Sequence, residues 1–187
     1  FASANPTGVE VYADRLVEGL VNKAAQLGYD QIRLYVRTIT ASQRLLDLVE
    51  ECGVRDLVQV RLLEHRHLWT LFWFSWELLL HPVHTLFVPT HTLPLIVPKR
   101  VVWTTHGLEG EHFPEAYSFS QRVYRRFSIL WAKWKGAQFI AISKAVKQDL
   151  MHFFGIKEAR ISVIYHGFDH RAEAKKPDEK SLIEGPL

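Results

Sequence analysis

The feature that most constrains the fold of this 187-residue chain is the alternation of short β-rich runs with helical patterns. Each run is rich in branched or aromatic side chains, as expected of a strand that is covered on both faces. Strands that alternate with helices in this way predict a mostly parallel, doubly wound α/β sheet. The residues before Asn5 resemble the end of one strand, and the others are predicted at residues 32–38, 57–63, 85–88, 100–104, 139–142 and 161–165.

Three helices between these strands are predicted from apolar residues that recur on one helical face. The first begins near Val9 and is expected to stop at Gly28, because glycine readily adopts the left-handed conformation common at helix ends. The second covers residues 119–134, and the third ends at Gly155. The three apolar faces comprise Val9, Ala13, Leu16, Leu20, Ala24 and Leu27; Phe119, Val123, Phe127, Leu130 and Trp134; and Val146, Leu150 and Phe153.

Composition narrows the classes of protein to consider. With 48% hydrophobic residues the chain can fill one core, and a net charge of +3 makes nucleic acid a poor candidate partner. The single cysteine excludes an internal disulfide framework and fits a reducing compartment. The longest apolar run, residues 68–80, contains Glu77 and is shorter than the roughly 20 residues needed to span a bilayer. It is therefore predicted to be a buried or interfacial helix.

The first candidate site lies at residues 5–10, where the chain passes from a strand into a helix. Thr7 and Glu10 have the spacing of a capping box, which predicts that the helix begins after Thr7. Gly8 leaves the backbone accessible, and the N–H groups at a helix start can bind an anion. A capped helix without a ligand and an anion site both remain open. A P-loop is excluded, because no Gly-Lys-Ser/Thr sequence follows.

The second candidate site is His106, which stands between a strand end and Gly107. Ligands of doubly wound sheets bind beyond the carboxyl ends of the strands, so contact between His106 and a polar substrate is favoured. A purely structural histidine is the alternative. A metal site is a further alternative, but the spacing of its candidate ligands fits no recurring zinc pattern, so no metal is expected. Those ligands would be His106, Glu109, Glu111 and His112.

Two other strand ends carry polar residues. Thr90 and His91 follow the strand at residues 85–88, so they would line the same rim as Thr105 and His106. Ser143 follows a buried strand and precedes a helix, which predicts that it is the N-cap. A ligand-facing role for Ser143 is equally open.

The helix at residues 119–134 is also basic and aromatic. Ser118 and Gln121 have capping-box spacing at its start. A helix of this kind can lie on an anionic membrane, and the favoured alternative is a solvated face with long side chains reaching water. The cations that flank its apolar face are Arg122, Arg125, Arg126, Lys133 and Lys135.

Taken together, five stretches resemble the N-terminal domain of retaining glycosyltransferases of the GT-B fold, glycosyltransferase family 4. The resemblance is closest to mannosyl- and rhamnosyltransferase-like members. The stretches occur in the family's order over about the first 170 residues, and they are residues 6–12, 89–95, 105–108 with 113–117, 142–150 and 161–169. Where the family commonly has His-Asp-Leu, this chain has His-Gly-Leu at residues 106–108.

The resemblance implies a Rossmann-like domain and a role for several residues. His106 would touch the transferred sugar or the acceptor hydroxyl and is the expected catalytic residue. We expect it to be partly exposed and within reach of the loop of Thr7 and Gly8, which would face the donor diphosphate and the acceptor. The other donor- or acceptor-binding residues are expected to be Thr90, His91, Thr105, Gly107, Ser143 and Gly167.

The resemblance also implies how the protein is organised. Residues 1–169 would form the acceptor-side domain, and residues 170–187 a charged linker to a donor-binding domain that this sequence lacks. The domain would help transfer a sugar from a nucleotide-sugar donor to a sugar or lipid-linked acceptor with retention, and would be inactive alone. No metal or other cofactor is expected. No secretory signal pattern is visible, so a cytoplasmic protein is expected, peripheral to the inner face of the membrane if the acceptor is lipid-linked.

Two alternatives come from other functional classes. The same fold could serve as a non-catalytic docking module. It could also be half of a dinucleotide-binding dehydrogenase, but no Gly-x-Gly-x-x-Gly sequence follows the first strand.

Overall fold

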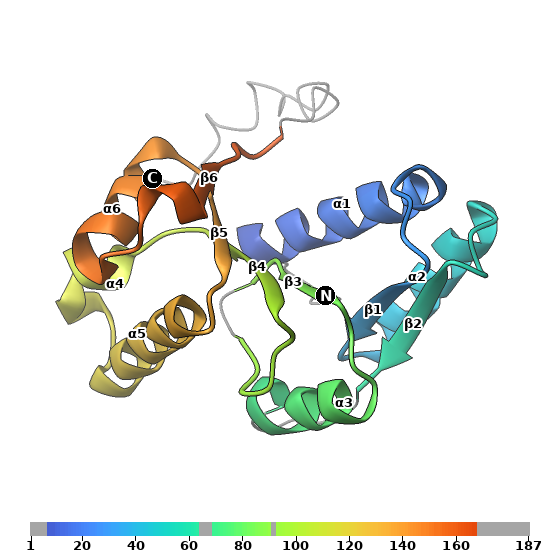
Figure 1. The fold of residues 1–187 in the computed structure, drawn as a ribbon, viewed down its shortest axis with the longest axis horizontal. Coiled ribbons are helices and arrows are strands. Elements are labelled where there is room, and N and C mark those ends of the chain that lie inside the picture. Colours follow the sequence, from blue (N-terminus) through green and yellow to red (C-terminus); the bar gives the residue numbers. More distant parts are fainter. Residues whose placement is uncertain (1–6, 64–68, 91–92, 168–187) are drawn as a thin grey trace, which may run out of the picture.

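The computed structural model describes residues 7–63, 69–90 and 93–167 (Figure 1). The strands within these residues are β1 (Ile32–Val36), β2 (Val58–Leu62), β3 (Thr85–Val88), β4 (Arg100–Thr105), β5 (Gln138–Ala141) and β6 (Ile161–Val163). The α-helices are α1 (Gly8–Asn22), α2 (Ile39–Glu51), α3 (Phe74–Leu80), α4 (Glu109–His112), α5 (Phe119–Trp134) and α6 (Lys144–Phe154). Shorter 3-10 turns cover Ala24–Gln26, Pro114–Ala116 and Glu158–Arg160, and a π-helical turn covers Trp69–Trp73.

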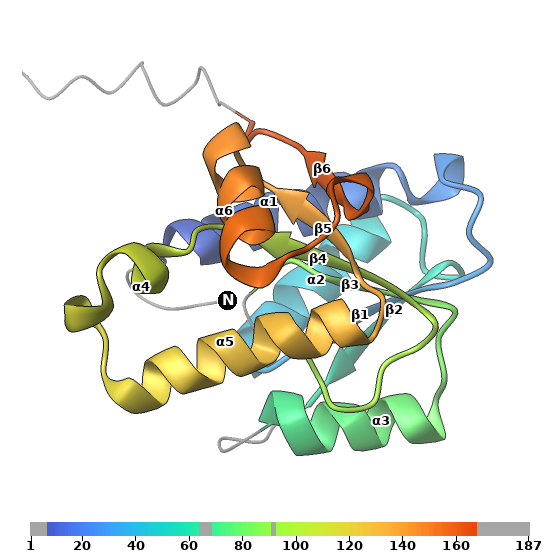
Figure 2. The ribbon, with the colours of Figure 1, turned by 60° about the vertical axis from the view of Figure 1, so that its left-hand side comes forward.

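The described strands pair in parallel and form two sheets. β1 pairs with β2, and the second sheet has the order β3-β4-β5-β6. All six strands predicted from residue 32 onward are present, whereas the strand expected before Asn5 lies outside the described residues. Both ribbon views place α3 and α5 on one side of the strands and α1 on the other (Figures 1 and 2). The chain therefore has the predicted Rossmann-like α/β architecture.

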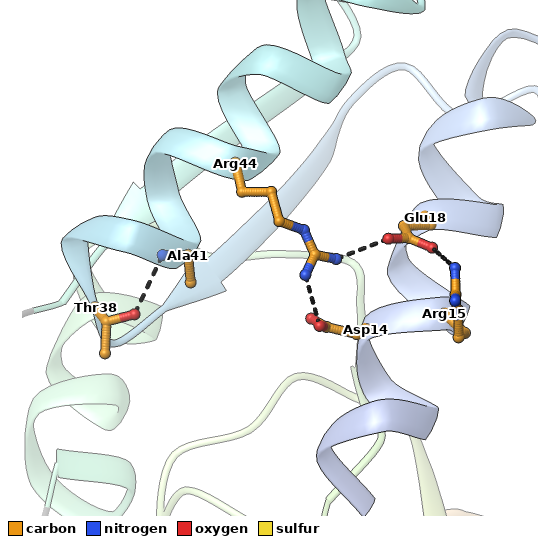
Figure 3. Close-up of polar contacts among 6 residues, drawn as sticks. All are labelled: Asp14, Arg15, Glu18, Thr38, Ala41 and Arg44. Carbon is orange, nitrogen blue, oxygen red and sulfur yellow. Dashed lines mark hydrogen bonds and ion pairs between the residues drawn. The ribbon is translucent and has the colours of Figure 1, made fainter. Parts of the chain in front are cut away.

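The small sheet has its own core, which α1 and α2 close. Val21 from α1, Leu45 and Val49 from α2, and Val58 from β2 are buried together. Arg44 of α2 crosses to α1, where its two terminal nitrogens lie 2.7 Å from a carboxylate oxygen of Asp14 and 2.8 Å from one of Glu18 (Figure 3). The helix α2 was not among those predicted from the sequence, and its N-cap is Thr38.

The larger sheet has a second core, between its strands and the helices α3, α5 and α6. Its most buried members include Phe139 of β5 and Leu150 of α6. Successive side chains of β4 face opposite sides of the sheet. Tyr12 of α1 reaches Thr104 on one side, with 3.5 Å between the hydroxyl oxygens, whereas Trp103 and Thr105 line a pocket beneath α5 on the other. The helix α1 thus joins the small core to the larger sheet.

Of the two helices predicted to stop at a glycine, one does so. Gly155 caps α6 with φ of 57°, in the left-handed conformation, as expected. The prediction that the first helix continues to Gly28 is wrong, because α1 ends at Asn22 and a 3-10 turn follows. Gly28 does adopt a positive φ of 67°, and it lies beyond that turn.

The apolar face of α5 points away from the core. Its described core-facing side chains are Ser128, Ile129 and Ala132 instead. The predicted apolar stripe lies on the opposite side and is exposed, with 79% of Phe119 and 71% of Trp134 accessible. Burial on α5 therefore follows its small residues, because these let the helix approach the sheet closely.

The aromatic segment before β3 is buried on one side only. Phe74 and Leu78 of α3 belong to the core, whereas Trp73, Trp76 and Leu79 are exposed. The segment is therefore buried on one side, and contact with a membrane interface stays a prediction. Across the described ranges, no helix is both long and apolar enough to cross a membrane.

Candidate functional site

The carboxyl ends of three strands of the larger sheet converge on the N-terminal half of α1. His106 follows β4, His166 follows β6, and the Pro89 carbonyl follows β3. The Tyr12 ring lies edge-on to His106 with 4.9 Å between centroids and stacks on His166 at 4.7 Å. The two imidazoles are 5.5 Å apart. We refer to Tyr12, His106 and His166 as the ring cluster.

The protonation of His106 is set by its surroundings. Its Nε2 lies 2.8 Å from the Pro89 carbonyl oxygen, and a carbonyl can only accept, so Nε2 carries a proton. Burial lowers the pKa of His106, the Pro89 carbonyl partly opposes this, and the nearby His166 lowers the pKa further. The imidazole is therefore neutral near pH 7, and its Nδ1 carries a lone pair.

His106 is partly buried and contacts α1, as a residue facing the strand-end rim should. The contact is with Tyr12, one turn into the helix from Gly8. A direct contact of His106 with Thr7 or Gly8 stays a prediction. The loop that follows His106 is engaged elsewhere, since Glu111 pairs with Arg126 at 2.5 Å and His112 pairs with Asp149 at 2.9 Å.

The start of α1 is a capping box, as predicted. The Glu10 amide donates to the Thr7 hydroxyl at 3.4 Å, and the Thr7 amide donates to the Glu10 carboxylate at 2.7 Å. A side chain at Gly8 would meet nothing within 4 Å, so the backbone there is accessible. The Glu10 carboxylate already places negative charge at this helix start, which weakens its attraction for an anion.

Ser143 is the N-cap of α6, as predicted. Its hydroxyl accepts a hydrogen bond from the Val146 amide at 3.2 Å, just past the end of β5. Gly167 follows His166 and is exposed. Thr90 contributes its backbone carbonyl, which accepts a hydrogen bond from the Trp103 indole. His91 lies outside the described residues.

Thr105 and Gly107 belong to a different place from the ring cluster. Thr105 is 4% exposed and, together with Gly107, lines a pocket between the end of β4, α4 and α5. The alternation of side chains along β4 explains this separation, because Thr104 and His106 face α1 whereas Thr105 faces α5. The end of β4 thus borders both the ring cluster and this pocket.

Tyr12 and His166 were not among the site residues predicted from the sequence. The signal for His166 was present, because Tyr165-His166-Gly167 after β6 repeats the pattern of Thr105-His106-Gly107 after β4. Tyr12 had no such signal, since an aromatic residue in the first turns of an amphipathic helix is common.

The four residues weighed as metal ligands do not gather around one point. In the part of the chain that the structure describes, no group of three or more His, Cys, Asp or Glu side chains is placed to hold a metal ion.

Comparison with known proteins adds an independent line of evidence. A family model described as Glycosyltransferase Family 4 matches residues 6–172. The O-antigen chain mannosyltransferase RfbU of Salmonella typhimurium is 25% identical over 93 residues, which are 50% of this chain and 25% of that protein. The match therefore spans about a quarter of the length of this curated relative. No solved structure matches the chain significantly.

Proposed function

The chain belongs to glycosyltransferase family 4, and from this premise we propose that it serves transfer of a hexose from a nucleotide-sugar donor to a hydroxyl acceptor, with retention of anomeric configuration. The relative named as a mannosyltransferase supports a mannose-like sugar. The observation that carries the proposal is the position of His106, a neutral imidazole at the strand-end rim.

The chemistry assigned to His106 follows from its tautomer. Nε2 donates to the Pro89 carbonyl, so Nδ1 can accept a hydrogen bond from a hydroxyl of the transferred sugar or of the acceptor. Such a bond aligns the reactants and can strengthen as positive charge develops at the anomeric carbon. Tyr12 and His166 hold the imidazole from two sides.

Departure of a nucleoside diphosphate requires positive charge or helix dipoles near the leaving phosphate. The starts of α1 at Thr7 and of α6 at Ser143 could contribute dipoles from this side. We assign the main cations to a second, donor-binding domain, with residues 1–169 as the acceptor side and residues 170–187 as the linker. The isolated chain is therefore expected to be inactive, and no metal or other cofactor is assigned.

The test is a transfer assay with two proteins, the 187-residue chain and the intact protein that carries it. Both are incubated with a panel of nucleotide sugars and sugar or lipid-linked acceptors, and product configuration is read by NMR. Transfer with retention by the intact protein alone supports the proposal. An intact protein that transfers no sugar would favour a docking module, and tight binding of nicotinamide dinucleotides would favour a dehydrogenase.

We further propose that α5 rests on an anionic membrane surface. Its exposed stripe includes Phe119, Phe127 and Trp134, which is an unusual amount of aromatic surface for one helix of a water-facing layer. By helical position, Arg122, Arg126 and Lys133 flank one edge of this stripe. On the other edge, the Lys135 ammonium lies 4.7 Å from the ring centroids of both Trp131 and Trp134.

Apolar side chains bordered by cations fit a bilayer with anionic headgroups. Each basic residue near such a surface contributes about 1 kcal/mol, and salt weakens this contribution. The helix α3, whose Trp76 side chain is exposed, lies on the same side of the sheet as α5 (Figure 2). A lipid-linked acceptor would then approach from this side.

Vesicle co-sedimentation tests the membrane contact. Binding is expected to be stronger to phosphatidylglycerol vesicles than to phosphatidylcholine vesicles, to fall with salt, and to be lost in a Phe127→Glu, Trp134→Glu double variant. Tyr29→Glu is the control, since Tyr29 is 57% exposed, between Phe127 at 44% and Trp134 at 71%, and lies between α1 and β1 rather than on α5. Equal binding to both kinds of vesicle would contradict the proposal.

A further inference from the structure

The pocket beneath α5 has features of a binding site that are separate from the ring cluster. Trp103 and Thr105 of β4 and Ile129 of α5 form its inner wall. Gly107 and Gly110 lie along the loop side, where the Glu109 carboxylate occupies the space beside Gly107 and the Tyr117 ring lies beside Gly110. The pocket opens at the carboxyl end of β4, where ligands of parallel sheets bind.

Thr105 is the unusual residue of this pocket. Its hydroxyl oxygen is buried and has no hydrogen-bond partner among the described residues. The adjacent Thr104 is also buried, but its hydroxyl lies 3.5 Å from that of Tyr12. A buried hydroxyl without a partner is costly, so its presence at a pocket wall points to a polar ligand.

The charges of the pocket show which kind of ligand would fit. Arg126 forms an ion pair with Glu111, with 2.5 Å between its Nη1 and a carboxylate oxygen of Glu111. Arg125 lies 4.0 Å from Glu109, with its guanidinium 4.6 Å from the Tyr117 ring centroid. The two carboxylates are thus matched by two arginines.

Arg122 is then the surplus cation. It lines the pocket, is half-buried, and has no ion-pair partner in the ranges that the structure describes. A guanidinium presents a planar set of donors that suits the oxygens of a phosphate group. A half-buried arginine and an unpartnered hydroxyl that line one pocket form a donor set for a compact oxyanion.

We propose that this pocket binds a phosphate group, with Arg122 and the Thr105 hydroxyl as its donors. That the phosphate belongs to the acceptor rests on the proposed function, whereas binding itself does not. Thr105 and His106 are adjacent in sequence and face opposite sides of β4. Both residues lie at the carboxyl end of β4, so a phosphate held at Thr105 would anchor an acceptor at the strand end that also carries the residue assigned to the sugar.

The phosphate could be carried by a soluble ester or by a lipid headgroup, and two ligands distinguish these sources. The 187-residue chain is titrated with sn-glycerol 3-phosphate and with dihexanoyl phosphatidic acid, at constant ionic strength, while the amide resonances of Gly107 and Gly110 are followed by NMR. Dihexanoyl phosphatidylcholine controls for apolar binding. Saturable shifts with the ester identify a soluble source, and shifts with phosphatidic acid alone identify a lipid source; both support the pocket.

Matched variants test the donors. Arg122→Gln is expected to weaken binding by about 10- to 100-fold, the scale of a lost charge-assisted hydrogen bond. Thr105→Val should weaken it by about 3- to 10-fold, and Thr105→Ser should retain it. Arg55→Gln is the control for loss of one exposed positive charge, since that side chain is 75% exposed elsewhere on the molecule.

The proposal is overturned if neither phosphate shifts these amides, or if Arg55→Gln weakens binding as much as Arg122→Gln. It is also overturned if Thr105→Val, with its fold verified by NMR, binds as tightly as the unsubstituted chain. Phosphate binding by a chain whose intact protein transfers no sugar would refute the proposed function and leave the pocket standing.

Discussion

Replacement of His106 by alanine should affect both stability and transfer, and the structure sets the size of the first effect. The variant loses the hydrogen bond to the Pro89 carbonyl and the edge-on contact with Tyr12. Each interaction is worth about 0.5–1.5 kcal/mol, so the free energy of unfolding should fall by about 1–3 kcal/mol. In a domain of this size that lowers Tm by about 2–12 °C.

His106→Gln separates the two effects. Its side-chain amide can still donate to the Pro89 carbonyl, so it should lose less stability than His106→Ala. Neither variant retains the imidazole Nδ1, so the transfer rate of the intact protein should fall about 10- to 1,000-fold in both. Urea denaturation measures stability, initial rates of transfer measure activity, and His84→Ala is the control because His84 is exposed and outside the ring cluster.

Two results would refute this reasoning. A His106→Ala protein that melts earlier but transfers sugar at the full rate would make His106 a structural residue only. A His106→Gln protein that matches the unsubstituted protein in both measurements would show that the imidazole has no role that an amide cannot fill.

Three further predictions concern acid, an interhelical contact and metal. The folded state lowers the pKa of His106 from 6.5, so the unfolded chain binds more protons there and the free energy of unfolding should fall as pH drops below about 6.5. Urea denaturation across pH 5–8 measures this fall, which should be shallower in His106→Gln. Parallel curves for the two proteins would contradict the prediction. Arg44→Ala should cost about 1 kcal/mol by loss of its contacts with Asp14 and Glu18, and a double-mutant cycle with Asp14→Ala that gives no coupling would contradict this. Treatment with EDTA should leave transfer by the intact protein unchanged, whereas loss of activity that Mg²⁺ or Mn²⁺ restores would show a metal requirement.

Much of the fold could be predicted because its strands and caps have local causes. The strand at β4 is marked by consecutive branched and aromatic residues, and Thr7, Ser118 and Ser143 are N-caps fixed by residues three positions away. The orientation of α5 had no local cause. Its apolar stripe predicts burial on that side, but Ser128 and Ala132 allow closer packing against the sheet, which a pattern of hydrophobicity does not reveal.

The only part of the candidate site that the sequence predicted is the part whose position is fixed by the end of a single strand. The place of His106 follows from its position after β4, whereas its contacts with Tyr12 and His166 join residues far apart in the chain. Thr105 was assigned to the same site as His106, because sequence proximity hides the fact that neighbours on a strand face opposite sides. The pocket beneath α5 combines Arg122 of α5 with Thr105 of β4, which only the packing of α5 against β4 brings about.

The two attachments of α1 couple the small sheet to the ring cluster. Val21 near the end of α1 is buried in the core of β1 and β2, while Tyr12 near its start stacks on His166. Local opening of that small core would release α1 and take Tyr12 away from both histidines, even with β3–β6 intact. Such sub-global unfolding would disrupt the ring cluster, and it would require less free energy than unfolding of the whole domain. Amide hydrogen exchange should then show α1 and β1 opening as one cooperative unit, ahead of β4 and β5.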